Sequence, residues 1–207
     1  MLDHVFSINF AVESEAYQAL TELKKAPVTA GYVLSQAAIV KREGGVISVK
    51  DSFDFGTETH DDRVIGGIIG SLTGVLGGPI GMLFYGSLGA LIGSTVDAKD
   101  FAENASILEK VSQSIGEGQT ALLIMASEEH SGALVERLAK FDTVTEKYDA
   151  AEVENEIEEA AKLQKQMEKD ARKQLRKEKT DEQKAKIAAK REEIRARFDG
   201  IKAKLGK

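Results

Sequence analysis

The sequence predicts an α+β protein in which a ferredoxin-like βαββαβ sandwich carries an inserted apolar helical hairpin and a long α-helical C-terminal extension. Three observations lead to this prediction. Strand and helix patterns alternate through residues 1–149, a glycine-rich insertion interrupts them at residues 57–98, and residues 150–207 are dominated by helix-forming side chains. We therefore expect a ferredoxin-like domain, an inserted glycine-zipper hairpin and a charged helical extension.

The first half of the domain has the pattern of a strand, a helix and a hairpin. Residues 4–10 alternate apolar and polar side chains and are rich in β-branched and aromatic types, which favours a strand. Residues 13–25 place apolar side chains at helical spacing and begin with glutamates that suit a helix N-terminus. Residues 32–41 and 46–50 are β-rich, and the Gly44-Gly45 pair between them supplies the positive φ of a hairpin turn.

The second half continues with a helix, a strand, a helix and a strand. Residues 100–115 carry apolar side chains on one helical face, and residues 119–126 form a continuous apolar run typical of a buried strand. A short helix over Ser131–Phe141 and a last strand over Thr143–Tyr148 complete the domain. A βαββαβ sandwich carries its helices on one face of the sheet, so we expect that arrangement here.

The extension predicts two helices that meet near residue 180. Residues 150–207 contain no proline and no glycine before Gly200. Thr180 and Gln183 match a capping box, which marks a helix start. The second helix carries one thin apolar stripe, which consists of Ile187, Ile194, Phe198, Ile201 and Leu205. Such sparse stripes favour a helix that docks on another surface over a long, stable coiled coil.

The glycine-rich insertion has its own pattern. Residues 64–96 lack any charge and contain ten of the chain's 19 glycines together with 15 large apolar side chains. Glycines recur every four residues, which places them in one stripe of a helix and allows close helix packing. Gly66, Gly70, Gly74 and Gly78 have this spacing, and Gly77 and Gly81, then Gly89 and Gly93, repeat it, with Tyr85 in the slot between. No lysine accompanies them, which excludes a Walker-type phosphate loop.

A membrane is the environment that this composition favours. Each interior glycine costs a helix about 0.8–1 kcal/mol relative to alanine, and a bilayer or a dry helix interface offsets that cost best. Gly77-Gly78-Pro79 should break the helix near its middle and leave two arms that are each short for a full span. Since the flanking strands belong to one sheet, we expect a re-entrant hairpin that enters and leaves on the same side.

These features together resemble a known family. A glycine-zipper insertion with a central Gly-Pro, a helix and then the sequence GEGQTALLIMA at residues 116–126 are similar to a widespread bacterial family of predicted membrane proteins of unknown function. The resemblance covers roughly residues 1–149, and the basic helical extension departs from it. It implies a ferredoxin-like core and membrane contact. The family has no known activity that the resemblance could extend to this chain.

The sequence offers no constellation for catalysis. It has no cysteine, which excludes disulfides, thiolate metal sites and cysteine nucleophiles. His60 and His130 lie next to carboxylates, but neither has the helical ligand spacing of a metal site. We therefore expect neither an enzyme nor a bound metal or cofactor, and we identify no small-molecule substrate.

The charge is unevenly distributed. Residues 1–161 hold 11 Lys/Arg and 26 Asp/Glu, a net charge of −15, whereas residues 162–207 hold 17 Lys/Arg and 8 Asp/Glu, a net charge of +9. A basic tail on an acidic body suggests an anionic partner, although its charges could also satisfy one another. Anionic lipid is the expected partner and nucleic acid the weaker alternative, with contact through Arg172, Lys173, Arg176, Lys177, Lys190, Arg191, Arg195 and Arg197.

The sequence thus predicts a membrane-associated, self-assembling, non-enzymatic protein of structural or stress type. The N-terminus lacks the basic region of a secretory signal, so we expect the cytoplasmic face of the membrane. Two alternatives stay open: a soluble oligomeric module that binds a ligand or regulates, and a pore-forming or membrane-disrupting protein. A homo-oligomer is expected in the leading hypothesis.

Overall fold

The computed structural model of the chain describes residues 2–55, 67–82, 84–85, 105–170, 172–173 and 186. The chain divides into two compact units, Met1–Gln164 and Lys165–Lys207. In the second unit, residues 165–170 and 172–173 are helical. The expected joint near residue 180 lies outside the described residues.

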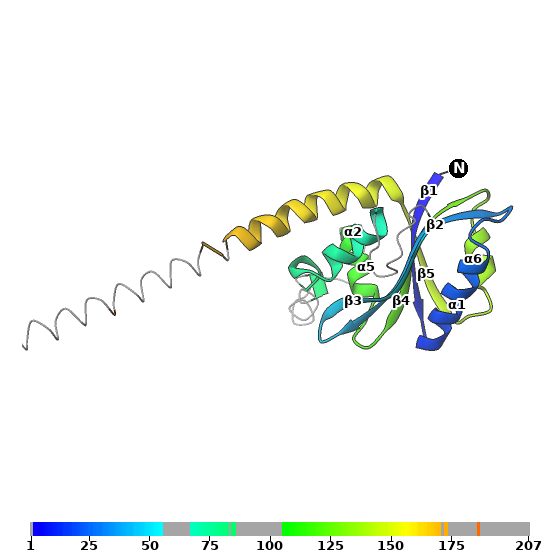
Figure 1. Cartoon of the computed structure of the whole chain (residues 1–207), viewed down its shortest axis with the longest axis horizontal. Helices are drawn as coiled ribbons and strands as arrows, with labels where there is room; N and C mark the ends of the chain where they lie inside the picture. Colours follow the sequence, from blue (N-terminus) through cyan, green and yellow to red (C-terminus); the bar gives the residue numbers. More distant parts are fainter. Residues whose placement is uncertain are drawn as a thin grey trace, which may run out of the picture. The chain divides into compact units, whose positions relative to one another are not determined.

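The first unit is built around one five-stranded antiparallel sheet (Figure 1). Its strand order is β3-β2-β4-β1-β5. The strands are β1 (Leu2–Phe10), β2 (Tyr32–Glu43), β3 (Val46–Asp54), β4 (Thr120–Glu128) and β5 (Thr143–Asp149). All five lie where the alternating and continuous apolar runs predict them, and the prediction of an α+β fold is confirmed.

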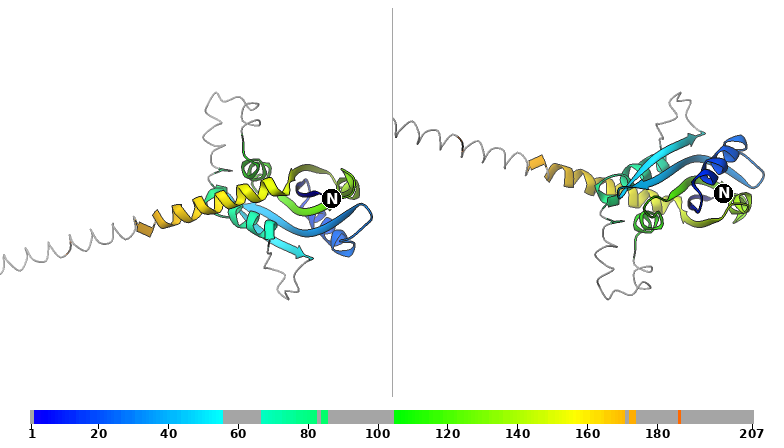
Figure 2. Two further views of the ribbon diagram at one scale, coloured as in Figure 1. Left: turned by 90° about the horizontal axis from the view of Figure 1, so that it is seen from above. Right: turned by 90° about the horizontal axis from the view of Figure 1, so that it is seen from below.

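Helices cover both faces of this sheet, as Figures 1 and 2 show. On one face, α1 (Glu13–Lys25) and α6 (Ala133–Leu138) pack against side chains such as Phe6 and Ile124. The other face is covered by α2 (Gly67–Leu76), α5 (Ile107–Ser114) and the helical residues 150–164. The expectation that all helices lie on one face is therefore wrong, because α2, α5 and residues 150–164 form a second layer.

The first arm of the glycine-rich segment belongs to the core. Ile69, Leu72 and Leu76 of α2 are each 0% exposed and pack with Val40 of β2 and Leu123 of β4. The sheet therefore supplies a dry surface for this helix, which differs from the bilayer or helix interface that the sequence predicts. Among the described residues, no helix has the length and apolarity needed to cross a membrane.

The predicted break of the glycine-rich helix is confirmed. Helix α2 ends at Leu76, a turn follows at Gly77 and Gly78, and helical backbone resumes at Pro79. A Cβ atom on Gly77 would lie 2.7 Å from the carbonyl oxygen of Ile47 in β3. The break therefore rests directly against the sheet, and the absence of a side chain at Gly77 permits that approach.

Helix α5 begins later than its apolar pattern predicts. Ser106 is its N-cap, and its side chain and that of Glu109 form a reciprocal capping box. The Glu156 carboxylate also accepts hydrogen bonds from the backbone N–H groups of Ile107 (3.0 Å) and Leu108 (2.9 Å). These contacts satisfy the free N–H groups of the first turn, which explains why the helix begins there. The preceding residues 101–104 lie outside the described ones.

Candidate functional site

The outward surface of α2 is the candidate site, and it comprises Gly70, Ser71 and Gly74, with Gly78 in the turn that follows. We call it the outer face of α2. Ser71 and Gly74 are exposed, whereas Gly70 and Gly78 are half-buried. A Cβ atom added at Gly74 would have no neighbour within 4 Å. Since α2 carries no charged residue, this face is uncharged, and it has space for a side chain at Gly74.

The other glycines that the structure describes in this segment, and Gly78 as well, fit closely against the rest of the same chain. Gly67 has φ +65°, and a side chain there would collide with the Gln36 amide. A Cβ atom on Gly81 would collide with the Leu76 carbonyl, and one on Gly78 would come within 2.5 Å of the Gln164 side-chain oxygen. Pro79 is exposed at the start of the next helical turn. The predicted packing stripe therefore divides into glycines that fit the chain's own turns and glycines that face outward.

Part of the predicted site cannot be placed. Gly66, Gly89 and Gly93 lie outside the described residues, as do Arg176, Lys177, Lys190, Arg191, Arg195 and Arg197 of the basic tail. Arg172 and Lys173 are exposed on helical backbone. Of residues 64–96, for which the sequence predicts a re-entrant hairpin, the structure describes 67–82 and 84–85.

Arg42 forms a buried polar node that the sequence analysis missed. Its side chain is 0% exposed and donates to the backbone oxygens of Ile115 (2.7 Å), Ser112 (2.6 Å) and Gly45 (2.6 Å). The guanidinium also lies 3.8 Å from the ring centroid of Tyr85, which follows the helix break. Arg42 thus ties the C-terminus of α5, the β2–β3 turn and the glycine-rich segment together.

Arg42 remains a cation in this environment. Burial lowers the pKa of the guanidinium, and the neighbouring Tyr85 and Glu117 act in the opposite direction. The guanidinium of arginine is so strong a base that it stays protonated in proteins even when buried. A positive charge at the C-terminal carbonyls of α5 also complements the helix dipole. The node is a structural clamp, since its donors are engaged by the chain's own carbonyl groups.

The sequence did carry a signal for this clamp. Arg42 follows Ala38 and Val40 at alternate positions of β2, and both of those side chains lie in the core beneath α2 and α5. Alternate residues of a strand share one face, so the period places Arg42 inward. A strand position that is inward and charged is a candidate for a buried clamp.

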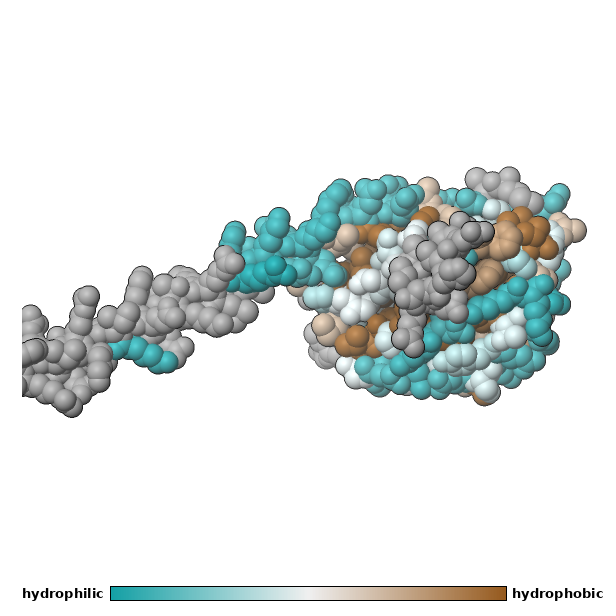
Figure 3. Space-filling model, in the orientation of Figure 1, coloured by the Kyte–Doolittle hydropathy of each residue, from teal (hydrophilic) through white to brown (hydrophobic). Residues whose placement is uncertain are grey.

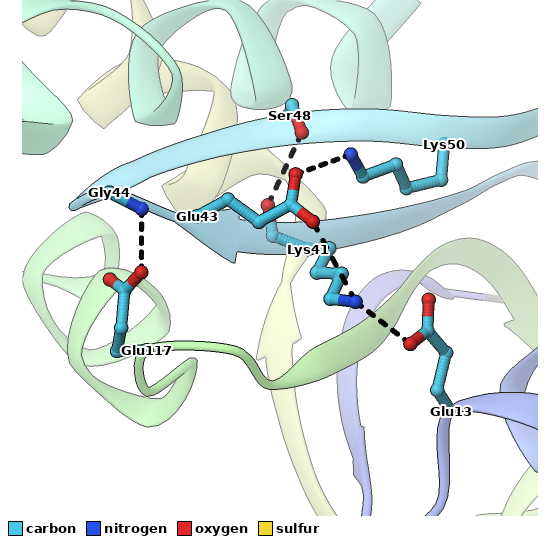
Figure 4. Close-up of polar contacts among 7 residues, drawn as sticks. All are labelled: Glu13, Lys41, Glu43, Gly44, Ser48, Lys50 and Glu117. Carbon is cyan, nitrogen blue, oxygen red and sulfur yellow. Dashed lines mark hydrogen bonds and ion pairs between the residues drawn. The ribbon is translucent and has the colours of Figure 1, made fainter.

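The opposite face of the β2–β3 hairpin carries a surface ion-pair cluster (Figure 4). Lys41 lies 2.8 Å from Glu13 and 3.7 Å from Glu43, and Lys50 lies 2.7 Å from Glu43. The hydrogen bond to Glu13 raises the pKa of Lys41, and the hydrogen bond from Lys50 lowers the pKa of Glu43. Exposed ion pairs of this kind contribute little stability, and each charge is neutralised by another.

The turn of this hairpin is held from the other side. The Glu117 carboxylate accepts hydrogen bonds from the backbone N–H groups of Gly44 (2.5 Å) and Gly45 (2.9 Å). Both glycines have positive φ, 61° and 79°, which confirms the turn that the Gly-Gly pair predicts. Together with Arg42, Glu117 joins the hairpin to the α5–β4 connection.

In the cluster Glu128-Glu129-His130, the Glu128 carboxylate has a structural role. Glu128 accepts a hydrogen bond from the Leu134 N–H (2.9 Å) at the start of α6 and pairs with Lys147 (2.6 Å). Burial alone would raise the pKa of Glu128, but the hydrogen bonds from Lys147, Leu134 and Gly132 outweigh it and lower that pKa. Over the described part of the chain, no three His, Asp or Glu side chains gather in a way that could hold a metal ion. His60 lies outside that part.

Comparison with protein-family models, with curated proteins and with solved structures found no match.

Proposed function

We propose that this chain is a non-enzymatic assembly protein that associates with copies of itself through the outer face of α2. The observation that carries the proposal is Gly74, which is exposed on a regular helix and has open space where a side chain would lie. A glycine in a helix interior costs about 1 kcal/mol relative to alanine, and the fold of one chain does not require it at this position. Close approach of a second helix would require it, as in small-xxx-small packing.

Two of the hypotheses from the sequence, the membrane-associated assembly and the soluble oligomer, both require self-association. The burial of Ile69, Leu72 and Leu76 against the sheet supports this shared part, because α2 then presents one fixed outer surface to a partner. Contact with a membrane stays a prediction from the uncharged residues 64–96 and the basic tail, as does a location on its cytoplasmic face.

We infer further that the sheet is a ferredoxin-like arrangement with β3 added at one edge. The support is the strand order: without β3, the remaining order is β2-β4-β1-β5, with β4 and β1 in the centre. Each of the two helices α1 and α6 then connects strands separated by one strand of the sheet, which is the pattern of a split βαβ unit.

Bulk at Gly74 should dissociate the assembly, whereas a methyl group should not. We expect Gly74→Leu to raise the dissociation constant of the homo-oligomer at least tenfold, or about 1.4 kcal/mol, because a long side chain prevents close helix approach. Gly74→Ala should keep the oligomer. Sedimentation velocity of the full-length chain over a range of concentrations measures both, with circular dichroism to establish that each variant folds.

Two results would argue against the proposal. One is a wild-type chain that remains monomeric at the highest concentration reached. The other is an equal oligomer population in Gly74→Leu and Gly74→Ala, which would mean that the outer face of α2 is not an interface.

A further inference from the structure

An apolar groove lies beside α2 and is separate from the outer face. It has a volume of about 540 Å³ and lies between the helical turn after Pro79, the start of α5 and the helical residues 150–164. Its apolar lining is Ile80, Phe84, Leu108, Ala160 and Leu163. Figure 3 shows hydrophobic surface directly beside the hydrophilic surface of the helix 150–164. Leu163 is 53% exposed, so the groove opens to solvent along this helix.

The helix that forms one side of the groove is strongly acidic. The helical residues 150–164 contain five glutamates and one lysine, which gives a net charge of −4. Glu159 lines the groove and pairs with Lys162 (2.7 Å), and Glu152 lies two helical turns earlier on the same side; both glutamates are exposed. Glu156 is already engaged as a cap of α5. An occupant that suits this groove therefore has an apolar stripe flanked by positive charge.

The chain itself contains such a segment. In residues 187–205, the apolar stripe Ile187, Ile194, Phe198, Ile201 and Leu205 has the spacing of one helix face. Lys190, Arg191 and Arg195 lie among these positions. Amphipathic helices with anchors at this spacing bind apolar grooves, and their charges provide the specificity.

The sequence favours a second copy as the donor of this segment. Residues 165–199 contain no Gly, Asn or Pro, which commonly reverse a chain after a helix, and the predicted joint at the Thr180 capping box has none of these residues either. We propose that the basic C-terminal segment 187–205 of one copy docks in the acidic groove of another. This inference deepens the proposed self-association, on which it rests, by adding a second contact that does not use α2.

Charge reversal on the two sides tests the docking. The groove variant is Glu152→Lys with Glu159→Lys, and the tail variant is Arg191→Glu with Arg195→Glu, each in the full-length chain. Each variant alone should raise the dissociation constant of the oligomer at least about tenfold, because the reversed charges repel the unchanged partner. A 1:1 mixture should form a hetero-oligomer, since Glu tails meet Lys grooves and Arg tails meet Glu grooves.

The matched control is Glu154→Lys with Glu158→Lys, which makes the same change in net charge on the far side of the same helix. It should leave the dissociation constant within about twofold of wild type. Sedimentation velocity and native mass spectrometry read both the size and the composition of the complexes, at low and at high salt.

Several outcomes would overturn the docking. If the control weakens association as much as the groove variant does, net charge is responsible. If the mixture forms no more oligomer than either variant alone, and chemical crosslinks join the tail to the groove within one chain, the occupant is the chain's own tail. If the tail variant changes only flotation on vesicles of anionic lipid, the tail serves a membrane. Gly74→Leu combined with each variant separates the two proposals, because the charge effects persist there if the groove is a contact of its own.

Discussion

Replacing Arg42 with methionine should lower the free energy of unfolding by about 3 kcal/mol or more. The methionine side chain fills much of the same space but leaves the buried carbonyl oxygens of Ile115 and Ser112 without a donor. Each buried polar group without a partner costs about 1–3 kcal/mol. Chemical denaturation of the two proteins, followed by circular dichroism, measures the difference.

The neighbouring residue provides the control. Lys41 lies on the same strand but makes only surface ion pairs with Glu13 and Glu43, so Lys41→Met should change stability by no more than about 1 kcal/mol. Equal losses in the two variants would show that the Arg42 hydrogen bonds do not hold α5 to the hairpin.

Alanine at two glycines three residues apart should have effects of opposite sign. Gly77→Ala should destabilise the protein by about 1–3 kcal/mol, because its Cβ atom would lie 2.7 Å from the Ile47 oxygen and 3.1 Å from the Thr73 oxygen. Gly74→Ala should stabilise the helix by up to about 1 kcal/mol, since no atom lies within 4 Å of the new methyl group.

Thermal unfolding of both variants and of the wild type measures the sign of each change in stability. The experiment is best made at a concentration where the chain is monomeric, so that assembly does not contribute to the melting temperature. A destabilising Gly74→Ala, or a neutral Gly77→Ala, would mean that α2 is not placed on the sheet as described.

The strands and most helices could be predicted because their signals are local. The alternation in residues 4–10 and the Gly44-Gly45 turn depend on near neighbours in the sequence, and β1 and the hairpin lie where these patterns predict them. The break at Gly77-Gly78-Pro79 is predictable for the same reason, because glycine and proline act on the backbone at their own positions.

What covers the second face of the sheet could not be read in the same way. Burial of a large aliphatic residue such as Leu72 is favourable both in lipid and against a sheet, and its helical spacing is the same in the two environments. The better signal lay in β4, where Ala121 to Ile124 are all 0% exposed. A strand apolar on both faces indicates a sheet covered on both sides, and α2 is one of the covers.

The two classes of glycine are equally inseparable in sequence. Gly70, Gly74 and Gly78 share one spacing, yet Gly74 faces open space and Gly78 lies against the Gln164 side chain. The second contact joins residues 86 positions apart, so no local pattern reports it. The clamp at Arg42 similarly depends on carbonyls 70 and 73 residues away.

Crosslinking through a single cysteine tests the central claim, self-association through the outer face of α2, most directly. The chain has no native cysteine, so Ser71→Cys places one thiol on this face, and Val144→Cys places one on β5 at a side chain that is 69% exposed. A short bifunctional thiol reagent should link Ser71→Cys chains into dimers, leave Val144→Cys chains unlinked, and lose its effect on Ser71→Cys when Gly74→Leu is added. Crosslinking of Ser71→Cys that matches the β5 control, or that persists unchanged with Gly74→Leu, would contradict the proposed interface.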